Sequence, residues 1–136
     1  VLPSYCGNCS RCIDGCPTQA ISKNNELEST KCISYLTIEH RGNLPVSQEI
    51  KKKIGTWIAG CDICQEVCPF NFKSQKSADT QDLNDDDLIP KTWNGLHALD
   101  EATYKETIKN SALSRIKWAD FKRNLELSFK NSKKTT

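Results

Sequence analysis

The sequence predicts an α+β fold in two parts, a small cysteine-rich domain over residues 1–72 and an α-helical C-terminal segment over residues 93–136. Two observations support this division. All eight cysteines lie in the first part, seven of them in two closely spaced runs. From Trp93 onward, by contrast, apolar residues recur at helical spacing. Residues 73–92 between the two parts are mostly polar, which predicts an exposed linker.

The first cysteine run, over residues 6–17, reads C-x2-C-x2-C-x3-C-P. This is the bacterial ferredoxin pattern, in which thiolates bind [4Fe–4S] clusters and the last cysteine of the run ligates the other cluster. A second run, over residues 61–69, reads C-x2-C-x3-C-P and lacks one cysteine of the triplet. Cys32 lies between the runs, and we predict that it replaces the missing ligand. The first part is therefore expected to be a ferredoxin-like domain.

Eight thiols suffice for two [4Fe–4S] clusters with four ligands each. Because the last cysteine of each run points away from its own loop, the grouping is expected to be interleaved. The first cluster is then held by Cys6, Cys9, Cys12 and Cys68, and the second by Cys16, Cys32, Cys61 and Cys64. Disulfides or zinc are alternatives for an even number of cysteines. However, the sequence shows no signal peptide, and triplets that end in C-P are not a zinc pattern.

The composition is compatible with a small metal-dependent fold. Of the 136 residues, 37% are hydrophobic, and the formal net charge is +2. Metal ligation can contribute folding free energy that a small core does not supply. The chain contains no Met and starts at Val1, so we expect the C-terminal portion of a longer protein or a processed chain. Free thiolates suit a reducing compartment and no apolar run could span a bilayer, which predicts a cytoplasmic monomer without membrane contact.

Local patterns predict the elements of the first part in order. Residues 13–16 should form a helical turn, and residues 18–21 and 27–28 a hairpin that shields a cluster. Residues 29–40 favour a helix, although their β-branched content makes a strand nearly as plausible. Pro45 is expected to open a helix that ends at Gly60.

Two helices are expected in the C-terminal segment. Asp100 is a candidate N-cap of the first helix, with Tyr104 and Ile108 facing inward. The second helix should begin near Ile116 and carry an apolar stripe. The stripe comprises Trp118, Phe121, Leu125 and Phe129. Residues 130–136 are expected to form a frayed polar tail.

Two segments carry a more specific resemblance. Residues 32–42 read CISYLTIEHRG and residues 60–71 read GCDICQEVCPFN. The chain resembles the epoxyqueuosine reductase family over about residues 5–72, and more weakly as far as Asn124. The resemblance implies the electron-delivering C-terminal portion of an oxidoreductase. Such an enzyme reduces epoxyqueuosine to queuosine at the wobble position of tRNAs with a GUN anticodon.

The resemblance also implies cobalamin, shared with an N-terminal domain that this sequence lacks. The catalytic residues are expected in that domain, so the portion would be inactive alone and no catalytic residue is assigned here. Ser34, Tyr35 and Asp62 are the implied neighbours of cobalamin or substrate. His40 is either a polar contact to tRNA or cofactor, or an ordinary hydrogen-bonding histidine. The electron donor is unidentified.

Basic residues are candidates for contacts with tRNA phosphates, with a solvated helix face as an equal alternative for each. They are Lys51, Lys52, Lys53, Arg115, Lys117, Lys122 and Arg123. Two other functions fit the clusters, a stand-alone two-cluster ferredoxin-type carrier and the wiring domain of a reductive dehalogenase-like cobalamin enzyme. The amino-acid sequence of residues 32–42 favours the epoxyqueuosine reductase family over the dehalogenase. The cationic helical C-terminus argues against a simple carrier.

Overall fold

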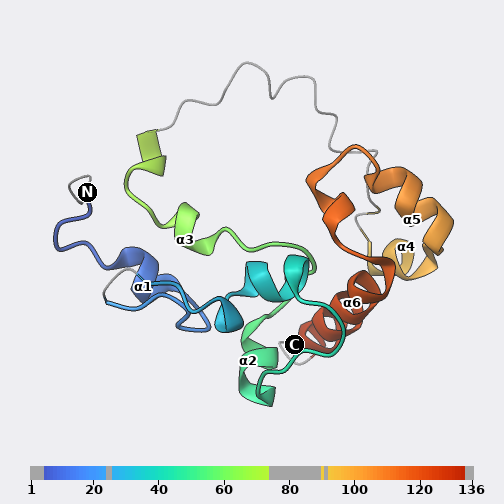
Figure 1. Cartoon of the computed structure of the whole chain (residues 1–136), viewed down its shortest axis with the longest axis horizontal. Helices are drawn as coiled ribbons and strands as arrows, with labels where there is room; N and C mark the ends of the chain where they lie inside the picture. Colours follow the sequence, from blue (N-terminus) through green and yellow to red (C-terminus); the bar gives the residue numbers. More distant parts are fainter. Residues whose placement is uncertain (1–4, 24–25, 74–89, 91, 134–136) are drawn as a thin grey trace.

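The computed structural model describes residues 5–23, 26–73, 90 and 92–133. The cysteine-rich part contains α1 (Arg11–Gly15), α2 (Gln48–Lys53) and α3 (Ile63–Glu66), and the C-terminal part contains α4 (Trp93–Ala98), α5 (Glu101–Ile108) and α6 (Trp118–Ser132). Short helical turns complete the set: 3-10 turns η1 (Ser29–Lys31), η3 (Asn71–Lys73) and η5 (Ala112–Arg115), and the π-helix η2 (Tyr35–Glu39). Helices α1 and α3 lie at one end of the molecule and α4 and α5 at the other (Figure 1).

The predicted α+β class is not confirmed, because the described residues contain no strand. The expected hairpin closes only one isolated antiparallel bridge, between Ile21 and Leu27. Gln19 has a φ of 54°, in the left-handed region, which ends one arm of the hairpin. On the other arm η1 begins at Ser29. Both arms are therefore too short for a ladder to extend.

The predicted helix over residues 45–60 is also shorter than expected. Its N-cap is Ser47, whose Oγ accepts a hydrogen bond from the Ile50 N–H at 3.2 Å. Gly55 follows the helix with a φ of 61°, a conformation that a right-handed helix cannot contain. The helix therefore occupies only Gln48–Lys53.

The helical interpretation of residues 29–40 is confirmed in part: η1 and η2 are helical, but Cys32 between them has extended backbone, and the π-helical form of η2 was not predicted. The His40 N–H donates to the Tyr35 carbonyl at 3.0 Å, a separation of five residues. The Thr37 hydroxyl donates to the Ile33 carbonyl at 2.7 Å. Such insertions into helices are frequent at functional sites.

The C-terminal predictions are largely confirmed. Asp100 Oδ1 accepts a hydrogen bond from the Thr103 N–H at 2.7 Å, and Tyr104 and Ile108 are buried. Helix α6 runs to Ser132, past the start of the predicted tail. Helix α4 was not predicted, although Thr92 caps it. The predicted linker lies mostly outside the described residues.

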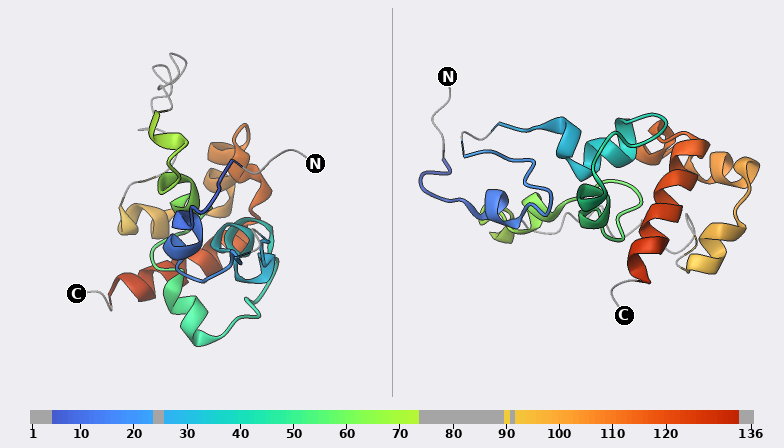
Figure 2. Two further views of the ribbon diagram at one scale, coloured as in Figure 1. Left: turned by 90° about the vertical axis from the view of Figure 1, so that its left-hand side faces the viewer. Right: turned by 90° about the horizontal axis from the view of Figure 1, so that it is seen from below.

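Two apolar clusters form the core. One joins η2 to α2 and contains Ile33, Leu36, Leu44 and Ile54. The other lies among the C-terminal helices and contains Leu96, Tyr104, Ile108, Ile116, Phe121 and Leu125. Helix α6 lies between the segment over residues 36–60 and helices α4 and α5 (Figure 2). In the described part of the chain, no helix has the length and apolar character needed to cross a membrane.

One face of α6 binds backbone groups of the cysteine-rich part. Side chains at positions 120, 124, 128 and 131 recur about once per helical turn. Asp120 Oδ1 accepts a hydrogen bond from the Gly42 N–H (2.9 Å). Asn124 Nδ2 donates to the carbonyls of Thr37 (2.7 Å) and Ile58 (2.9 Å), and Ser128 Oγ donates to the Trp57 carbonyl (2.9 Å). Asn131 Nδ2 donates to the carbonyls of Lys51 (2.9 Å) and Gly55 (3.0 Å). The two parts of the chain are thus joined by specific polar contacts as well as by apolar packing.

Candidate iron–sulfur site

Four cysteines from three separate segments line one cavity of about 390 Å³. They are Cys16, Cys32, Cys61 and Cys64. This is the set that the interleaved grouping assigns to the second cluster. The walls between the thiols are mainly apolar, and include Ala20, Ile21, Leu27 and Ile63.

The thiols of this set are close enough to influence one another electrostatically. Burial raises the pKa of the Cys61 thiol, and the charges of Cys64, Cys32 and Cys16 raise it further, against a backbone hydrogen bond from Ile63 that lowers it. Converging thiolates repel one another unless a cationic group lies between them. An iron core would relieve that repulsion.

The donor set fits a polynuclear cluster better than a single ion. Within residues 5–23, 26–73 and 92–133, no three His, Cys, Asp or Glu side chains are arranged to hold one metal ion. Each cysteine of a [4Fe–4S] cluster binds a different iron, so the sulfurs lie further apart than the ligands of a zinc ion. All eight cysteines are free thiols, which removes the disulfide alternative for this structure.

Local hydrogen bonds hold the sulfur of Cys16 at the cavity. The Ala20 N–H donates to Cys16 Sγ at 3.3 Å, and the Thr18 hydroxyl lies 3.6 Å from the same sulfur. Burial raises the pKa of the Cys16 thiol, but the hydrogen bonds from Ala20 and Thr18 outweigh it, and the net pKa is lowered. The site therefore favours the thiolate, the form that binds metal.

A buried hydroxyl links the segments that carry Cys32 and Cys61. Thr37 Oγ1 donates to the Ile33 carbonyl at 2.7 Å and accepts a hydrogen bond from the Gly60 N–H at 3.0 Å. Ile33 follows Cys32 and Gly60 precedes Cys61 in the chain. The sequence carries no periodic signal for Thr37, so its role emerges only from the structure.

Substitution of Gly60 should destabilise the fold because of its backbone conformation. Its φ is 76°, in the left-handed region that side chains disfavour. A clash is not the cause, because an added Cβ would lie 3.7 Å from the nearest atom, Ile38 Cδ1, an ordinary contact distance. We expect Gly60→Ala to lower the free energy of unfolding by about 1 kcal/mol. Urea unfolding of the iron-loaded chain would measure this. Gly60→Asn should cost less and Gly60→Val more, because Asn tolerates the left-handed region; equal costs would contradict the explanation.

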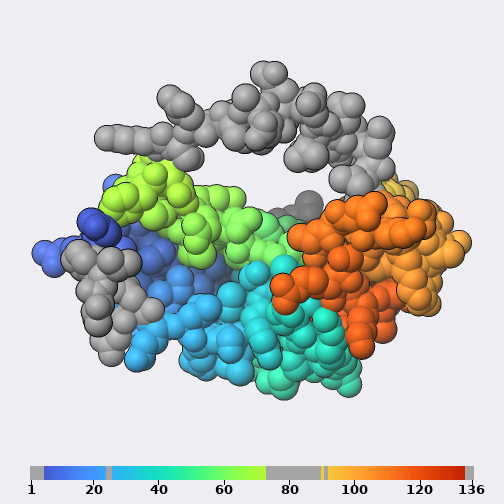
Figure 3. Space-filling model, turned by 45° about the horizontal axis from the view of Figure 1, so that its top comes forward, coloured from blue at the N-terminus to red at the C-terminus, as the bar shows by residue number. Residues whose placement is uncertain are grey.

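The first cluster's cysteines lie in an exposed loop and on two packed helices. Cys6 and Cys9 are exposed, and their loop is closed by a hydrogen bond from the Cys9 N–H to the Cys6 carbonyl at 3.0 Å. Cys12 lies in α1 and Cys68 follows α3, and these two helices pack together. Figure 3 shows the α3 region against α1 at one end of the molecule. The grouping of these four cysteines stays a prediction.

Two of the three predicted cofactor neighbours lie at the cavity. Ser34 and Asp62 line it, together with Gln65, which the sequence did not single out. Tyr35 does not line it; its ring is 6.4 Å from that of His40. His40 Nε2 is bonded to the Asn43 carbonyl at 2.8 Å, which supports the ordinary hydrogen-bonding role for this histidine.

Comparison with known proteins agrees with this site. Residues 5–71 match the family described as 4Fe-4S double cluster binding domain. The epoxyqueuosine reductase of Cyclobacterium marinum is 43% identical over 121 residues, which cover 89% of this chain and 37% of that protein. The chain belongs to the epoxyqueuosine reductase family. It spans little more than a third of the length of that relative, within its C-terminal part.

Solved epoxyqueuosine reductases share the fold. The structure from Streptococcus thermophilus has a TM-score of 0.79 and 31% sequence identity, and the match covers 96% of this chain and 34% of that chain. Another crystal structure is of epoxyqueuosine reductase with an epoxyqueuosine-modified tRNA-Tyr stem loop. It has a TM-score of 0.76 and 29% identity, again over 96% of this chain and 34% of that chain. The likeness therefore extends beyond the cysteine-rich part to the C-terminal helices.

Arg123, one of the candidate tRNA contacts, is bonded to other groups of the same chain. Its side chain is 17% exposed and pairs with Asp120 at 3.1 Å. The guanidinium also donates to the carbonyls of Leu36 (3.1 Å) and His40 (3.3 Å). Burial lowers the pKa of Arg123, with the charge of Asp120 opposing that shift. The structure therefore does not support Arg123 as a phosphate contact.

The other basic candidates differ in their exposure and in whether they form ion pairs or ring contacts. Arg115 pairs with Glu39 at 2.5 Å, and Lys53 pairs with Glu49 at 2.8 Å. Lys52 and Lys117 are exposed. Lys51 is half-buried, and Lys122 lies over the Trp118 ring at 5.4 Å. Phosphate contacts by these residues stay a prediction.

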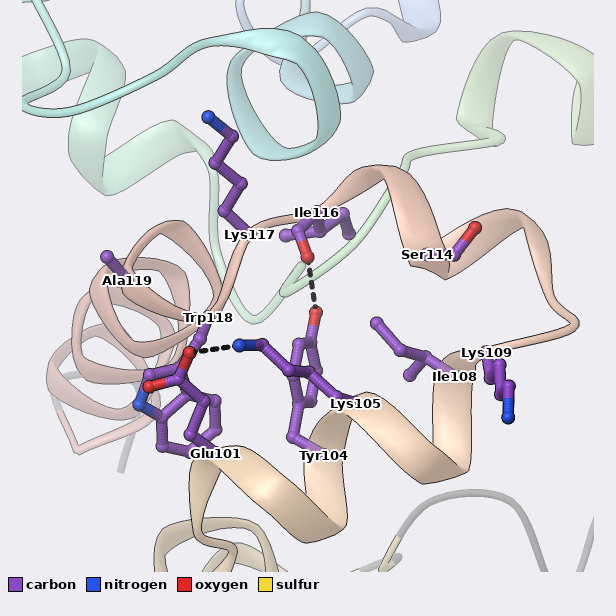
Figure 4. A pocket seen from close by; sticks show the side chains of 10 residues that line it. All are labelled: Glu101, Tyr104, Lys105, Ile108, Lys109, Ser114, Ile116, Lys117, Trp118 and Ala119. Carbon is purple, nitrogen blue, oxygen red and sulfur yellow. Dashed lines mark hydrogen bonds and ion pairs between the residues drawn. The ribbon is translucent and has the colours of Figure 1, made fainter.

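A second cavity, of about 450 Å³, lies between α5 and the start of α6 (Figure 4). It is lined by three lysines, but they do not converge. Lys105 pairs with Glu101 at 2.6 Å, and Lys109 and Lys117 point in different directions. Tyr104 donates to a backbone carbonyl, and burial raises its pKa to about 12, so the hydroxyl stays neutral. The cavity thus lacks the convergent charge of a binding site.

Proposed function

We propose that this chain is the electron-delivering iron–sulfur portion of a tRNA epoxyqueuosine reductase. The observation that carries the proposal is the cavity lined by Cys16, Cys32, Cys61 and Cys64. Four thiols from three segments, in a chain that matches a double-cluster domain, are the ligands that a [4Fe–4S] cluster needs. Such clusters transfer single electrons when bound.

The residues of the chain would hold and insulate the two clusters. Cys6, Cys9, Cys12 and Cys68 are the proposed ligands of the first cluster, and the four cavity cysteines are those of the second. Apolar side chains of the cavity wall, such as Ile21 and Ile63, would shield the second cluster from water. The Ala20 N–H donates to the sulfur of Cys16, and hydrogen bonds of this kind tune the reduction potential of a cluster.

The proposed substrate is epoxyqueuosine at the wobble position of a tRNA with a GUN anticodon. A related structure carries an epoxyqueuosine-modified tRNA-Tyr stem loop, which supports this choice. Removal of the epoxide oxygen as water, leaving a carbon–carbon double bond, consumes two electrons and two protons. The electrons would reach the substrate one at a time through this portion, and the proton donor is expected in the N-terminal domain.

Cobalamin is the proposed acceptor of those electrons, shared with the N-terminal domain. Ser34 and Asp62 line the second-cluster cavity, which supports a place for them beside the cofactor. Tyr35 stays a candidate on its exposure of 37%, which leaves it accessible to a neighbouring domain.

The test uses the full-length protein that contains this chain, reconstituted anaerobically with iron, sulfide and cobalamin. We expect conversion of epoxyqueuosine to queuosine in tRNA with a GUN anticodon. Cys61→Ser should abolish the conversion, because the second cluster would lose a ligand. Asp62→Asn should weaken cobalamin binding, read as a smaller change in the visible spectrum of the corrinoid.

The outcomes separate the alternatives. Iron loading without any corrinoid spectral change would indicate a ferredoxin-type carrier instead. A corrinoid change without selective retention of tRNA with a GUN anticodon would favour a dehalogenase-like enzyme. Zinc in place of iron would overturn the proposal.

A further inference from the structure

A hydrogen-bonded path connects α6 to the residues next to two of the cavity cysteines. Asn124 is 1% exposed, and its Nδ2 donates to the carbonyls of Thr37 at 2.7 Å and Ile58 at 2.9 Å. Thr37, also 1% exposed, in turn bonds Ile33 and Gly60 through its hydroxyl. Two buried side chains therefore tie together backbone segments that are more than twenty residues apart in the sequence.

The path ends beside two proposed ligands of the second cluster. Ile33 is the residue after Cys32, and Gly60 is the residue before Cys61. Among the described residues no strand pairing joins these segments, so their separation depends on side-chain contacts. A shift in either segment would change the distance between the two sulfurs.

The path reaches only ligands of the second cluster. Helix α6 packs on η2 and on α4 and α5. Helices α1 and α3, which carry or adjoin Cys12 and Cys68 and also Cys16 and Cys64, lie at the far end of the molecule from α4 and α5 (Figure 1). The path from Asn124 instead ends next to Cys32 and Cys61, which belong to the second set alone. A disturbance at Asn124 should therefore act on the second cluster, through Cys32 and Cys61, and not on the ligands of the first.

We propose that Asn124 and Thr37 are positioning residues for the second [4Fe–4S] cluster, acting through Cys32 and Cys61. Helix α6 thereby helps to position the ligands of the second cluster. The inference rests on the ligand grouping in the proposed function, and the clusters serve as internal references for each other.

The test places Asn124→Asp in two backgrounds of the full-length protein. Cys12→Ala leaves only the second cluster, and Cys32→Ala leaves only the first. Asn124→Asp keeps the size of the side chain and its acceptor for Arg123 but removes the donor to Thr37 and Ile58. In the Cys12→Ala background we expect iron release to a chelator to be about tenfold faster, with a shifted midpoint potential, and in the Cys32→Ala background no change.

Two further variants distinguish positioning from general destabilisation. Ser128→Ala removes another buried bond of α6, to the Trp57 carbonyl, and should lower stability without changing either cluster. Thr37→Val should reproduce the effect of Asn124→Asp on the second cluster, and Thr37→Ser, which keeps the hydroxyl, should restore it.

Equal acceleration of iron release in both backgrounds, or in neither, would overturn the positioning role while leaving the proposed function intact. An effect of Ser128→Ala as large as that of Asn124→Asp would do the same. If the Cys12→Ala and Cys32→Ala backgrounds did not each retain one cluster, the ligand grouping itself would fail, and the inference with it.

Discussion

The double variant Cys16→Ala/Cys32→Ala should retain about four irons per chain, whereas Cys32→Ala/Cys68→Ala should retain none. Cys16 and Cys32 line the same cavity, with Cys61 and Cys64, so removing both destroys only one cluster. Cys68 belongs to the other proposed set, so the second double variant disables both clusters. Iron and sulfide quantitation after anaerobic reconstitution, with EPR of the reduced protein, would measure the difference.

The two double variants control for each other, because each removes two thiols and includes Cys32→Ala. The unsubstituted chain should bind about eight irons, and Cys32→Ala alone about four. If each cysteine run instead held its own cluster, the results for the two double variants would be reversed. Full iron loading of Cys32→Ala would show that Cys32 is not a ligand.

Arg123→Met should lower the free energy of unfolding by about 3 kcal/mol. The substitution keeps most of the aliphatic stem but removes the guanidinium, which bonds the Leu36 and His40 carbonyls. It also leaves Asp120, only 4% exposed, with one longer ion pair, to Arg41 at 3.5 Å, beside the hydrogen bond from the Gly42 N–H at 2.9 Å. An under-compensated buried carboxylate is costly. Urea unfolding of the iron-loaded chain would measure the loss.

Lys122→Met is the matched control, because Lys122 is the preceding cation on α6 and has no buried partner charge among the described contacts. Its cost should stay below about 1 kcal/mol. Adding Asp120→Asn to Arg123→Met should recover part of the loss, since the buried charge is then removed as well. Additive costs for the two substitutions would show that the ion pair is not the cause.

Local sequence signals predicted those elements that depend on neighbouring residues. Asp100 caps α5 through the Thr103 N–H, three residues away, and the apolar stripe of α6 is visible in its spacing. The cysteine runs likewise encode ligand loops within a few residues. Each of these features satisfies its own hydrogen bonds or ligand geometry locally, which is why a short window of sequence reveals it.

The ends of elements that stop near a residue with a positive φ were predicted less well. The hairpin stops at Gln19 and α2 stops before Gly55, both with positive φ. A positive φ can be predicted at Gly55, because glycine adopts it readily, but glutamine gives no reason to predict the left-handed region at Gln19. The length of both elements was overestimated for this reason.

The sequence by itself determined the kind of ligand, the number of thiols and the resemblance to the epoxyqueuosine reductase family, because cysteine spacing and motif wording are local properties of the chain. Only the tertiary structure decided that Thr37 and Asn124 connect the segments next to Cys32 and Cys61, and that Arg123 bonds the chain's own carbonyls. These outcomes depend on contacts between residues far apart in sequence, such as that of Asn124 with Thr37. Such contacts leave no periodic pattern, because a buried hydrogen bond needs only one donor and one acceptor brought together by the fold.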